Sequence, residues 1–389
     1  MTPIPVPLLA RIVDFVTLRR DIHAHPELGL AEFRTSDLIA AKLIEWGYDV
    51  TRGIAGTGLV GQLKRGTGDK RLGLRADMDA LPIQETTGLP HASRHDGVMH
   101  ACGHDGHTTM LLAAAQHLAE HGRFNGTLNL IFQPAEEHPG GAKMMLAEGL
   151  FERFPCDAVF AMHNMPGITQ GHLAFIDGPA MASSDDVTIT IRGTGGHGAM
   201  PHLANDPILA ASSIVLGLQS IVSRNVDPRQ TAVITVGAFN GGKANNVIPS
   251  HVTLELSVRA LDRDVRNLLE RRIKELVESQ AASFGLVADI QYKRDYPVLV
   301  NTLAETALAR DVGLELLGDG GVILHSEPLT GSEDFACMLE HCPGSYMMIG
   351  NGDGEGGCMV HNPGYDFNDD NISIGAAYWC LLTERFLPI

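Results

Sequence analysis

The chain has 389 residues, of which 44% are hydrophobic and 19% are charged, and this balance excludes a disordered or fibrous protein. The formal net charge of -17 makes nucleic acid and anionic membranes unfavourable partners, because both are themselves negatively charged. The length exceeds that of one ordinary domain and predicts a large domain together with a smaller one.

The N-terminal segment and the cysteines predict where the protein resides. Prolines interrupt residues 1–7, so we expect no signal peptide, and we expect no later segment that reaches membrane-spanning length. The six cysteines are scattered without regular spacing, which favours reduced thiols over a disulfide framework. These features predict a cytoplasmic protein that binds neither nucleic acid nor membrane.

The first half of the chain alternates helical and apolar segments. Apolar residues recur at helical spacing over residues 8–22 and 35–46. Short apolar runs predict buried strands at residues 59–63, 71–76, 127–133 and 158–163, and helices are predicted at 107–121 and 141–148. This alternation predicts a three-layer α/β catalytic domain.

A different pattern begins near residue 186. It predicts a strand at 187–192, a helix at 206–223, strands at 231–239 and 252–260, and a helix at 265–284. Two helices against a small antiparallel sheet predict an α+β unit of ferredoxin-like shape. The alternation resumes after residue 297, so we expect a satellite domain at 185–295, inserted into a catalytic domain made of residues 1–184 and 296–389.

The densest cluster of chemically active residues is the segment His-Ala-Cys-Gly-His-Asp-Gly-His at 100–107. Side chains two apart on an extended backbone share a face, so Cys102 and His104 can address one metal ion. The same short motif also fits a polar loop that caps the following helix.

Carboxylates follow two of the predicted strands. Glu136 and Glu137 come directly after the strand at 127–133, where one can bind a metal while the other moves a proton. Asp79 follows the strand at 71–76 and can hold a metal-bound histidine in its working tautomer. A solvated acidic turn explains each carboxylate cluster equally simply.

Two lone histidines complete the pattern. His163 ends the strand at 158–163, and His361 lies late in the chain. A single histidine is more often structural than a ligand, so these two gain weight only in combination. Together with Cys102, His104 and Glu137 they form a donor set that suits a pair of first-row divalent ions.

Short segments along the whole chain resemble, in order, the amidohydrolase branch of the aminoacylase and carboxypeptidase metallopeptidases. They are HAHPE at 23–27, RADMD at 75–79, HACGHDGH at 100–107, QPAEE at 133–137, HN at 163–164, GGHGAMPH at 195–202, NVIP at 246–249, GSEDF at 331–335 and VHNP at 360–363. That branch includes hippurate hydrolases, N-acyl-amino-acid deacetylases and plant auxin-conjugate hydrolases. The resemblance implies hydrolysis of the amide bond of small N-acyl or N-aroyl amino acids.

The resemblance also implies roles for individual residues. Cys102 would bridge two divalent ions, and Glu136 would be the general base. The other ligands that it implies are His104, His163, Glu137 and His361. Zinc or manganese is the expected metal, with cobalt or nickel as alternatives. In related carboxypeptidases a histidine replaces Asp77 and an aspartate replaces Cys102, so this chain follows the amidohydrolase branch rather than the wider pattern.

Three residues of the satellite domain receive implied roles. His197 matches the histidine that donates to the developing oxyanion, within its own subunit or across a dimer. Asn246 and Arg259 would bind the free carboxylate of the amino acid, although Arg259 also fits a surface ion pair. We expect a homodimer or homotetramer that forms through the satellite domain.

The sequence is also consistent with other functions. Cys102 could be a nucleophile with His104 or His107 as its base, which would make the protein a metal-free amidohydrolase. A dipeptidase or carboxypeptidase, or a non-catalytic metal- or peptide-binding protein, would use the same scaffold. The G-x-G-x-x-G pattern at 193–198 is not expected to bind a dinucleotide, because Pro201 and Pro207 interrupt the helix that should follow.

Four further histidines are predicted to be structural. His23 and His25 follow the end of a predicted helix. His117 and His121 lie four apart on a helix, but polar neighbours indicate a solvated face there.

Overall fold

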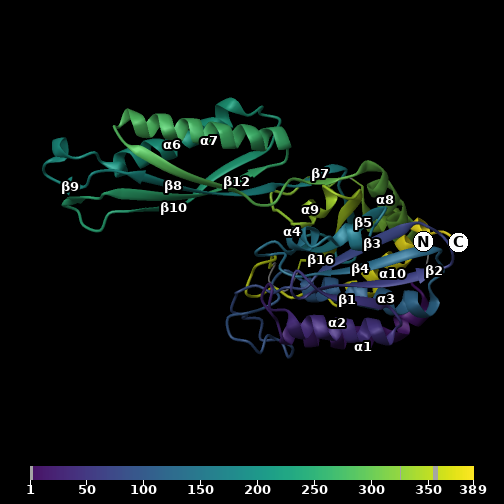
Figure 1. Ribbon diagram of the computed structural model, residues 1–389. Helices are drawn as coiled ribbons and strands as arrows, with labels where there is room; N and C mark the ends of the chain where they lie inside the picture. The colour runs from purple at the N-terminus through teal and green to yellow at the C-terminus, as the bar shows by residue number, and fades with distance from the viewer. Residues whose placement is uncertain (1–2, 325, 354–357) are drawn as a thin grey trace. The chain divides into compact units, whose positions relative to one another are not determined.

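The computed structural model describes residues 3–324, 326–353 and 358–389, so Met1 and Thr2 of the N-terminal segment lie outside it. The chain divides into two compact units, both drawn in Figure 1. Unit 1 comprises Met1–Gly178, Val300–Glu327 and Cys337–Ile389, and unit 2 comprises Pro179–Leu299 and Pro328–Ala336.

Unit 1 is built on an eight-stranded sheet with a parallel centre. In spatial order its strands are β1 (Asp49–Ile54), β2 (Gly58–Arg65), β4 (Gly126–Gln133), β3 (Arg71–Asp77), β5 (Ala158–Pro166), β16 (Gly344–Gly352), β6 (Leu173–Phe175) and β15 (Val322–Ile323). Strands β4, β3, β5 and β16 run parallel to one another, whereas β2 and β6 pair antiparallel with this centre. Central parallel strands are covered on both faces, which explains why their sequences are continuous apolar runs.

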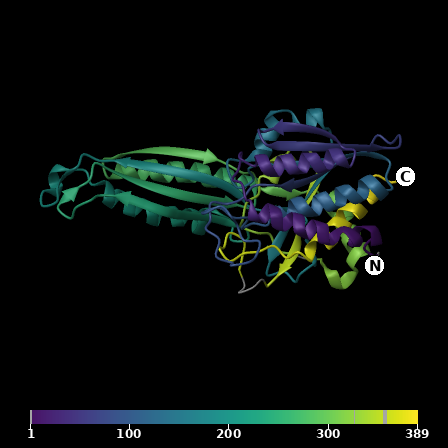
Figure 2. The same ribbon diagram turned by 90° about the horizontal axis from the view of Figure 1, so that it is seen from below.

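Helices surround this sheet. They are α1 (Val6–Ala24), α2 (Phe33–Glu45), α3 (His104–His121), α4 (Gly141–Ala147), α5 (Leu150–Arg153), α8 (Leu303–Leu317) and α10 (Asn371–Phe386). Figure 2 shows α1, α3 and α10 side by side, and all three share one hydrophobic core with the central strands. Helix α3 is buried from His104 to Gln116, so its N-terminal end, which carries His104 and His107, has a fixed position.

Unit 2 has the predicted ferredoxin-like order of elements. Its sheet, in spatial order, is β10 (Ala232–Gly241), β12 (His251–Ala260), β8 (Ser183–Arg192) and β13 (Val287–Arg294). Helix α6 (Pro207–Asn225) connects β8 to β10, and α7 (Arg263–Ser283) connects β12 to β13. Both helices pack against this antiparallel sheet in a second hydrophobic core, which confirms the mixed fold expected from the sequence.

The remaining short elements are β7 (Gly178–Met181), β9 (Gly196–His197), η1 (Pro201–Leu203), β11 (Val247–Ile248), β14 (Leu299–Asn301), η2 (Asp319–Gly321) and α9 (Phe335–Leu339). Strands β9 and β11 pair with each other at residues His197 and Val247.

One segment groups differently from its expected domain. Pro328–Ala336 falls within the predicted second part of the catalytic domain but is compact with unit 2. The Leu329 N–H donates to the Ala180 carbonyl at 2.9 Å, and the Arg259 guanidinium donates to the Ser332 hydroxyl at 2.7 Å. These hydrogen bonds join residues far apart in the sequence, which no local pattern could indicate.

Within the described residues, one helix is long and apolar enough to cross a membrane, by length and composition only. This helix is α6, and it corrects the expectation that no segment reaches that length. One face of α6, with Ala210, Ile214 and Leu218, is buried in the core of unit 2. That packing is typical of a core helix.

A buried ion pair links the helices and strands of unit 2. The Arg266 guanidinium on α7 donates to the fully buried Asp185 carboxylate on β8, with Nε to Oδ1 at 3.0 Å. The Tyr292 hydroxyl donates to the other oxygen of Asp185 at 2.8 Å. The carboxylate therefore has its hydrogen bonds supplied from two different elements.

We expect Arg266→Ala to lower the free energy of unfolding of unit 2 by about 3–5 kcal/mol, because it leaves the Asp185 charge buried without its cation. Arg294→Ala is the control, since Arg294 makes an exposed ion pair with Glu270 that should contribute less than about 1 kcal/mol. Urea denaturation followed by circular dichroism measures both. Equal losses in the two variants would contradict the role given to the buried pair.

Candidate metal centre

The candidate site lies where the central strands of unit 1 end. Asp79 follows β3, Glu136 and Glu137 follow β4, and His163 lies near the end of β5. The carboxyl ends of parallel strands meet at one edge of a sheet, so these side chains are brought together although they are distant in sequence.

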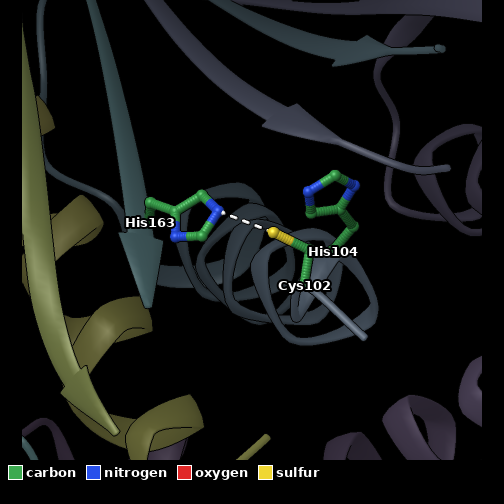
Figure 3. Close-up of side chains that lie close together, drawn as sticks. All are labelled: Cys102, His104 and His163. Carbon is green, nitrogen blue, oxygen red and sulfur yellow. Dashed lines mark hydrogen bonds between the residues drawn. The ribbon is translucent and has the colours of Figure 1, made fainter. Parts of the chain in front are cut away.

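Cys102 and His163 form the centre of this site. The Cys102 sulfur lies 3.2 Å from Nε2 of His163. Figure 3 shows this contact as a dashed line, with His104 on the other side of the sulfur. The ligand atoms of these three buried residues all lie within 4.8 Å of one another. His163 makes its other hydrogen bond from Nδ1 to the Asn164 carbonyl at 2.6 Å, which leaves the Nε2 lone pair facing the sulfur.

The orientation of His104 is set by Asp79. Nδ1 of His104 lies 3.2 Å from the Asp79 carboxylate, while its Nε2 is buried without a hydrogen-bond partner among the described residues. A carboxylate that accepts from Nδ1 fixes the tautomer in which Nε2 carries a lone pair. Nε2 is therefore the nitrogen of His104 that is left to bind a metal ion when the ring is neutral.

A second group of ligand atoms shares the same sulfur. Cys102, Glu137 and His361 have ligand atoms within 4.8 Å of one another. Oε1 of Glu137 lies 2.9 Å from Nε2 of His361, and it has no hydrogen bond in the described part of the chain. His361 adopts a left-handed backbone conformation with φ 62°, and its N–H donates to the Ala101 carbonyl at 2.6 Å.

The two groups fit a pair of metal ions. A buried imidazole nitrogen without a hydrogen-bond partner, such as Nε2 of His104, is costly unless something binds it. Thiolate, imidazole and carboxylate are together the donors that first-row divalent ions prefer. Cys102 belongs to both groups, so its thiolate could contribute a ligand to each.

Burial decides the protonation state of the central residues in the metal-free protein. Burial, together with Glu137 and Glu136, raises the pKa of the Cys102 thiol well above its usual value. Burial also lowers the pKa of His163 well below its usual value. Burial thus opposes the thiolate that a cysteine nucleophile would need.

His104 behaves differently from His163. Burial lowers its pKa, but the neighbouring Asp77 and Asp79 outweigh burial and raise the pKa to about 10. The site therefore attracts positive charge at the position of the His104 imidazole. A bound divalent ion would satisfy the same demand.

Glu136 lies inside the site with the ligands. Its side chain is buried, and a carboxylate oxygen lies within 4.8 Å of ligand atoms of His104 and Glu137. Its backbone N–H donates to Asp79 at 3.0 Å. The structure thus brings together all seven site residues predicted in the catalytic domain, namely Asp79, Cys102, His104, Glu136, Glu137, His163 and His361.

The predicted residues of unit 2 do not all lie together. His197 on β9 and Asn246 are neighbours, since the Gly198 N–H donates to the Asn246 carbonyl at 2.8 Å. Strand β12 begins at His251, which is close to Asn246 in the sequence. Arg259 lies near the other end of β12, where its guanidinium donates to Ser332. Within unit 2 the structure therefore separates Arg259 from the other two residues.

A buried hydrogen-bond network beneath the metal ligands was not predicted from the sequence. Nδ1 of His107 lies 2.7 Å from Asp77, and Nε2 of His107 accepts the Asn164 N–H at 2.9 Å. Both nitrogens of His107 are engaged, which excludes the role of general base considered for it. Asn164 also donates to the Cys102 carbonyl at 2.6 Å, and its position directly after His163 was the available signal.

Gly103 allows this network to close. Its φ of 89° is a conformation that glycine adopts readily. A Cβ at this position would lie 2.2 Å from Nδ2 of Asn164 and 2.5 Å from the Tyr365 hydroxyl. Any side chain between Cys102 and His104 would therefore displace the residues that hold the Cys102 backbone.

The other sequence features have structural explanations. Nδ1 of His23 lies 2.8 Å from Asp105, and the buried Arg19 contacts the same carboxylate. The G-x-G-x-x-G segment contains β9 and is followed by a 3₁₀ turn, and the next α-helix begins only at Pro207. This is not the strand, turn and helix sequence that cradles a dinucleotide.

Several known proteins are similar to this chain along most of its length. The model of the peptidase family M20/M25/M40 matches residues 73–385. The hippurate hydrolase of Campylobacter jejuni is 46% identical over 376 residues, which cover 96% of this chain and 97% of that protein. The N-acetyl-L-cysteine deacetylase of Bacillus subtilis is 40% identical over 376 residues, which cover 96% and 88%. A dinuclear metal-binding M20 peptidase from Bacillus subtilis has a TM-score of 0.85 at 32% identity, covering 97% of this chain and 99% of that one.

We expect Cys102→Ala to weaken both ion sites together, because each ligand group loses its shared donor. The metal content of the dialysed protein should fall from about two ions per chain to less than about one. His121→Ala is the control, since this half-exposed histidine lies at the far end of α3. Elemental analysis measures both, and a variant that still holds two ions would rule out a bridging sulfur.

Proposed function

Because the chain belongs to the peptidase family M20/M25/M40 and is a metal-dependent hydrolase of amide bonds, we propose that it hydrolyses N-acyl or N-aroyl amino acids with two divalent ions. The products are a carboxylic acid and a free amino acid. One observation carries the two-ion proposal: the Cys102 sulfur belongs to two separate groups of ligand atoms. The names of the two similar proteins, a hippurate hydrolase and a deacetylase of an N-acetylated amino acid, support the substrate class.

The donor set guides the choice of metal. We propose zinc or manganese, with cobalt or nickel as further possibilities, because a thiolate, imidazoles and a carboxylate suit all of these ions. When bound, two such ions would polarise the amide carbonyl and make a water molecule acidic enough to react near neutral pH.

Glu136 is the residue proposed to move the proton. Its buried carboxylate lies beside the ligand atoms of His104 and Glu137, yet the proposed ligand set does not require it. The carboxylate takes a proton from the attacking water and delivers it to the nitrogen of the leaving amino acid. Asp79 holds the backbone of Glu136 and the ring of His104, so that the base and a ligand keep a fixed relation.

His197 is proposed to donate to the oxygen of the tetrahedral intermediate, from its own subunit or from a partner subunit. Its Nδ1 accepts the Ala199 N–H at 3.0 Å, so the ring proton is placed on Nε2, the nitrogen that can donate. Asn246 and Arg259 are proposed to bind the carboxylate of the amino acid. We further propose a homodimer or homotetramer that forms through unit 2, and a cytoplasmic location in keeping with six free cysteines.

Removal of the metal tests the proposal directly. The protein is stripped with a chelator, reconstituted with zinc, manganese, cobalt or nickel, and assayed on benzoyl-glycine, several N-acetyl amino acids and a simple dipeptide. Activity should disappear on stripping and return with metal, because the ions provide most of the polarisation of the amide. Activity that survives complete stripping would contradict the two-ion mechanism, and preference for the dipeptide would contradict the substrate class.

We expect Glu136→Gln to lower kcat by on the order of 10²–10⁴-fold while both ions stay bound, because an amide cannot accept the proton. Glu137→Gln is the matched comparison on the neighbouring residue, and it should lose metal as well as activity. Steady-state kinetics with elemental analysis separates the two effects. A Glu136→Gln variant with nearly normal kcat would assign the proton transfer to another group.

A further inference from the structure

Three consecutive backbone N–H groups after β4 are held by two buried carboxylates. The Glu136 and Glu137 N–H groups donate to Asp79 at 3.0 and 2.9 Å. The Ala135 N–H donates to Oε1 of Glu32 at 2.8 Å. Glu32 comes from the start of α2, far from this turn in the sequence.

We propose that Glu32 is a positioning residue that fixes the backbone of the turn carrying the base Glu136 and the ligand Glu137. Glu32 belongs to none of the groups of ligand atoms among the described residues, and it acts through the Ala135 amide. The inference rests on the proposed function, because it gives Glu136 and Glu137 their roles. It adds a second anchor to the one that Asp79 provides.

The capping of α2 does not explain the Glu32 side chain. Glu32 occupies the N-cap position, but its side chain makes no capping hydrogen bond. The carboxylate of Glu27 accepts the N–H groups of Arg34 and Thr35 instead, each at 2.9 Å. Since another residue satisfies these helix amides, the Glu32 carboxylate is directed to the turn.

The Glu32 carboxylate is held firmly in this position. The residue is fully buried, and Oε2 accepts the Thr57 hydroxyl at 2.6 Å. A carboxylate is buried only when its oxygens are well satisfied, so both of these contacts are needed to keep it there. Thr57 belongs to the turn between β1 and β2, so a third segment braces the contact.

The Ala135 backbone needs such a restraint. Its φ of 51° lies in the left-handed region, which residues with a Cβ rarely adopt. Strained conformations of this kind persist only where the surroundings enforce them. The segment that leads to Glu32 packs directly on the turn, since a Cβ at Gly29 would lie 2.4 Å from the His138 carbonyl and 3.0 Å from Cβ of Ala135.

The experiment compares Glu32→Ala and Glu32→Gln with a matched control. Glu148 makes the same kind of contact elsewhere: its carboxylate accepts the N–H of Ala55 at 3.0 Å, and Ala55 has a φ of 53°. Glu148→Ala therefore removes a carboxylate from a left-handed alanine outside the metal centre. All variants are titrated with zinc in a competition assay, and kcat and KM are measured on an amide that the wild type hydrolyses.

We expect Glu32→Ala to weaken binding of the ion held by Glu137, and to lower kcat, each by about 10–100-fold, with KM little changed. Glu32→Gln should recover most of both, because its amide oxygen can still accept the Ala135 N–H. Glu148→Ala should reduce zinc affinity and kcat less than Glu32→Ala does, because it loosens only the turn that carries Thr57. General destabilisation of the protein would not produce this pattern. It would not lower kcat of Glu32→Ala while leaving KM little changed, and it would not be reversed by Glu32→Gln.

A Glu32→Ala protein with wild-type zinc affinity and kcat per folded chain, and only a lower melting temperature, would overturn the proposal. If that variant does not fold, Thr57→Val tests the proposal instead, because it removes the hydroxyl that donates to the Glu32 carboxylate. Smaller losses of zinc affinity and kcat are expected there, and wild-type values would overturn the proposal. An inactive wild type would refute the proposed function, whereas the zinc titration would still test Glu32.

Discussion

The negative charge gathered around the Cys102 sulfur is the constraint on which the rest of the centre depends. The sulfur is buried, and Glu137, Glu136 and Asp77 all oppose its ionisation. Buried negative groups must be compensated by cations or by hydrogen bonds. The chain compensates part of this charge itself, as in the contact of 2.6 Å between Arg75 and Asp77. The donor atoms left without partners face the same point, so the fold calls for positively charged ions there.

Rigid elements meet this constraint, whereas the reactive groups sit on short turns. The sheet strands β3, β4 and β5 are central, and α3 is buried along most of its length. The turns after these strands are then fixed by side chains from elsewhere, such as Asp79 and Glu32. Two residues at the centre, Ala135 and His361, adopt left-handed conformations that only such surroundings can hold. These strained backbone conformations thus help to orient the base Glu136 and the metal-binding side chain of His361.

Local sequence patterns were sufficient for the core of the fold, and they placed the candidate site residues at the ends of its strands. The apolar runs predicted at 71–76, 127–133 and 158–163 correspond to β3 (Arg71–Asp77), β4 (Gly126–Gln133) and β5 (Ala158–Pro166), because buried parallel strands must be apolar. Metal-binding residue types after such strands were informative only in combination, because a polar turn explains each of them singly. The supporting contacts were not predictable in this way.

What the pattern missed depends on pairs of residues that are far apart in the chain. Glu32 looks like one of many surface glutamates until the Ala135 amide is seen beside it. His107 looks like a possible base until Asp77 and Asn164 are found on its two nitrogens. The segment Pro328–Ala336 has no feature that assigns it to unit 2 before its hydrogen bond to Ala180 is known. Each case is decided by tertiary structure rather than by residue type.

The shared sulfur also gives the centre a single point of chemical weakness. Thiolates are oxidised stepwise to sulfenic, sulfinic and sulfonic acids, and a carboxylate in the same place would be inert to peroxides. Because Cys102 belongs to both ligand groups, one oxidation event would alter both ion sites at once. Without metal, the raised pKa keeps Cys102 a thiol, whereas bound ions would favour the more easily oxidised thiolate. Burial of the sulfur, which limits the access of oxidants, is therefore most important when the site is occupied.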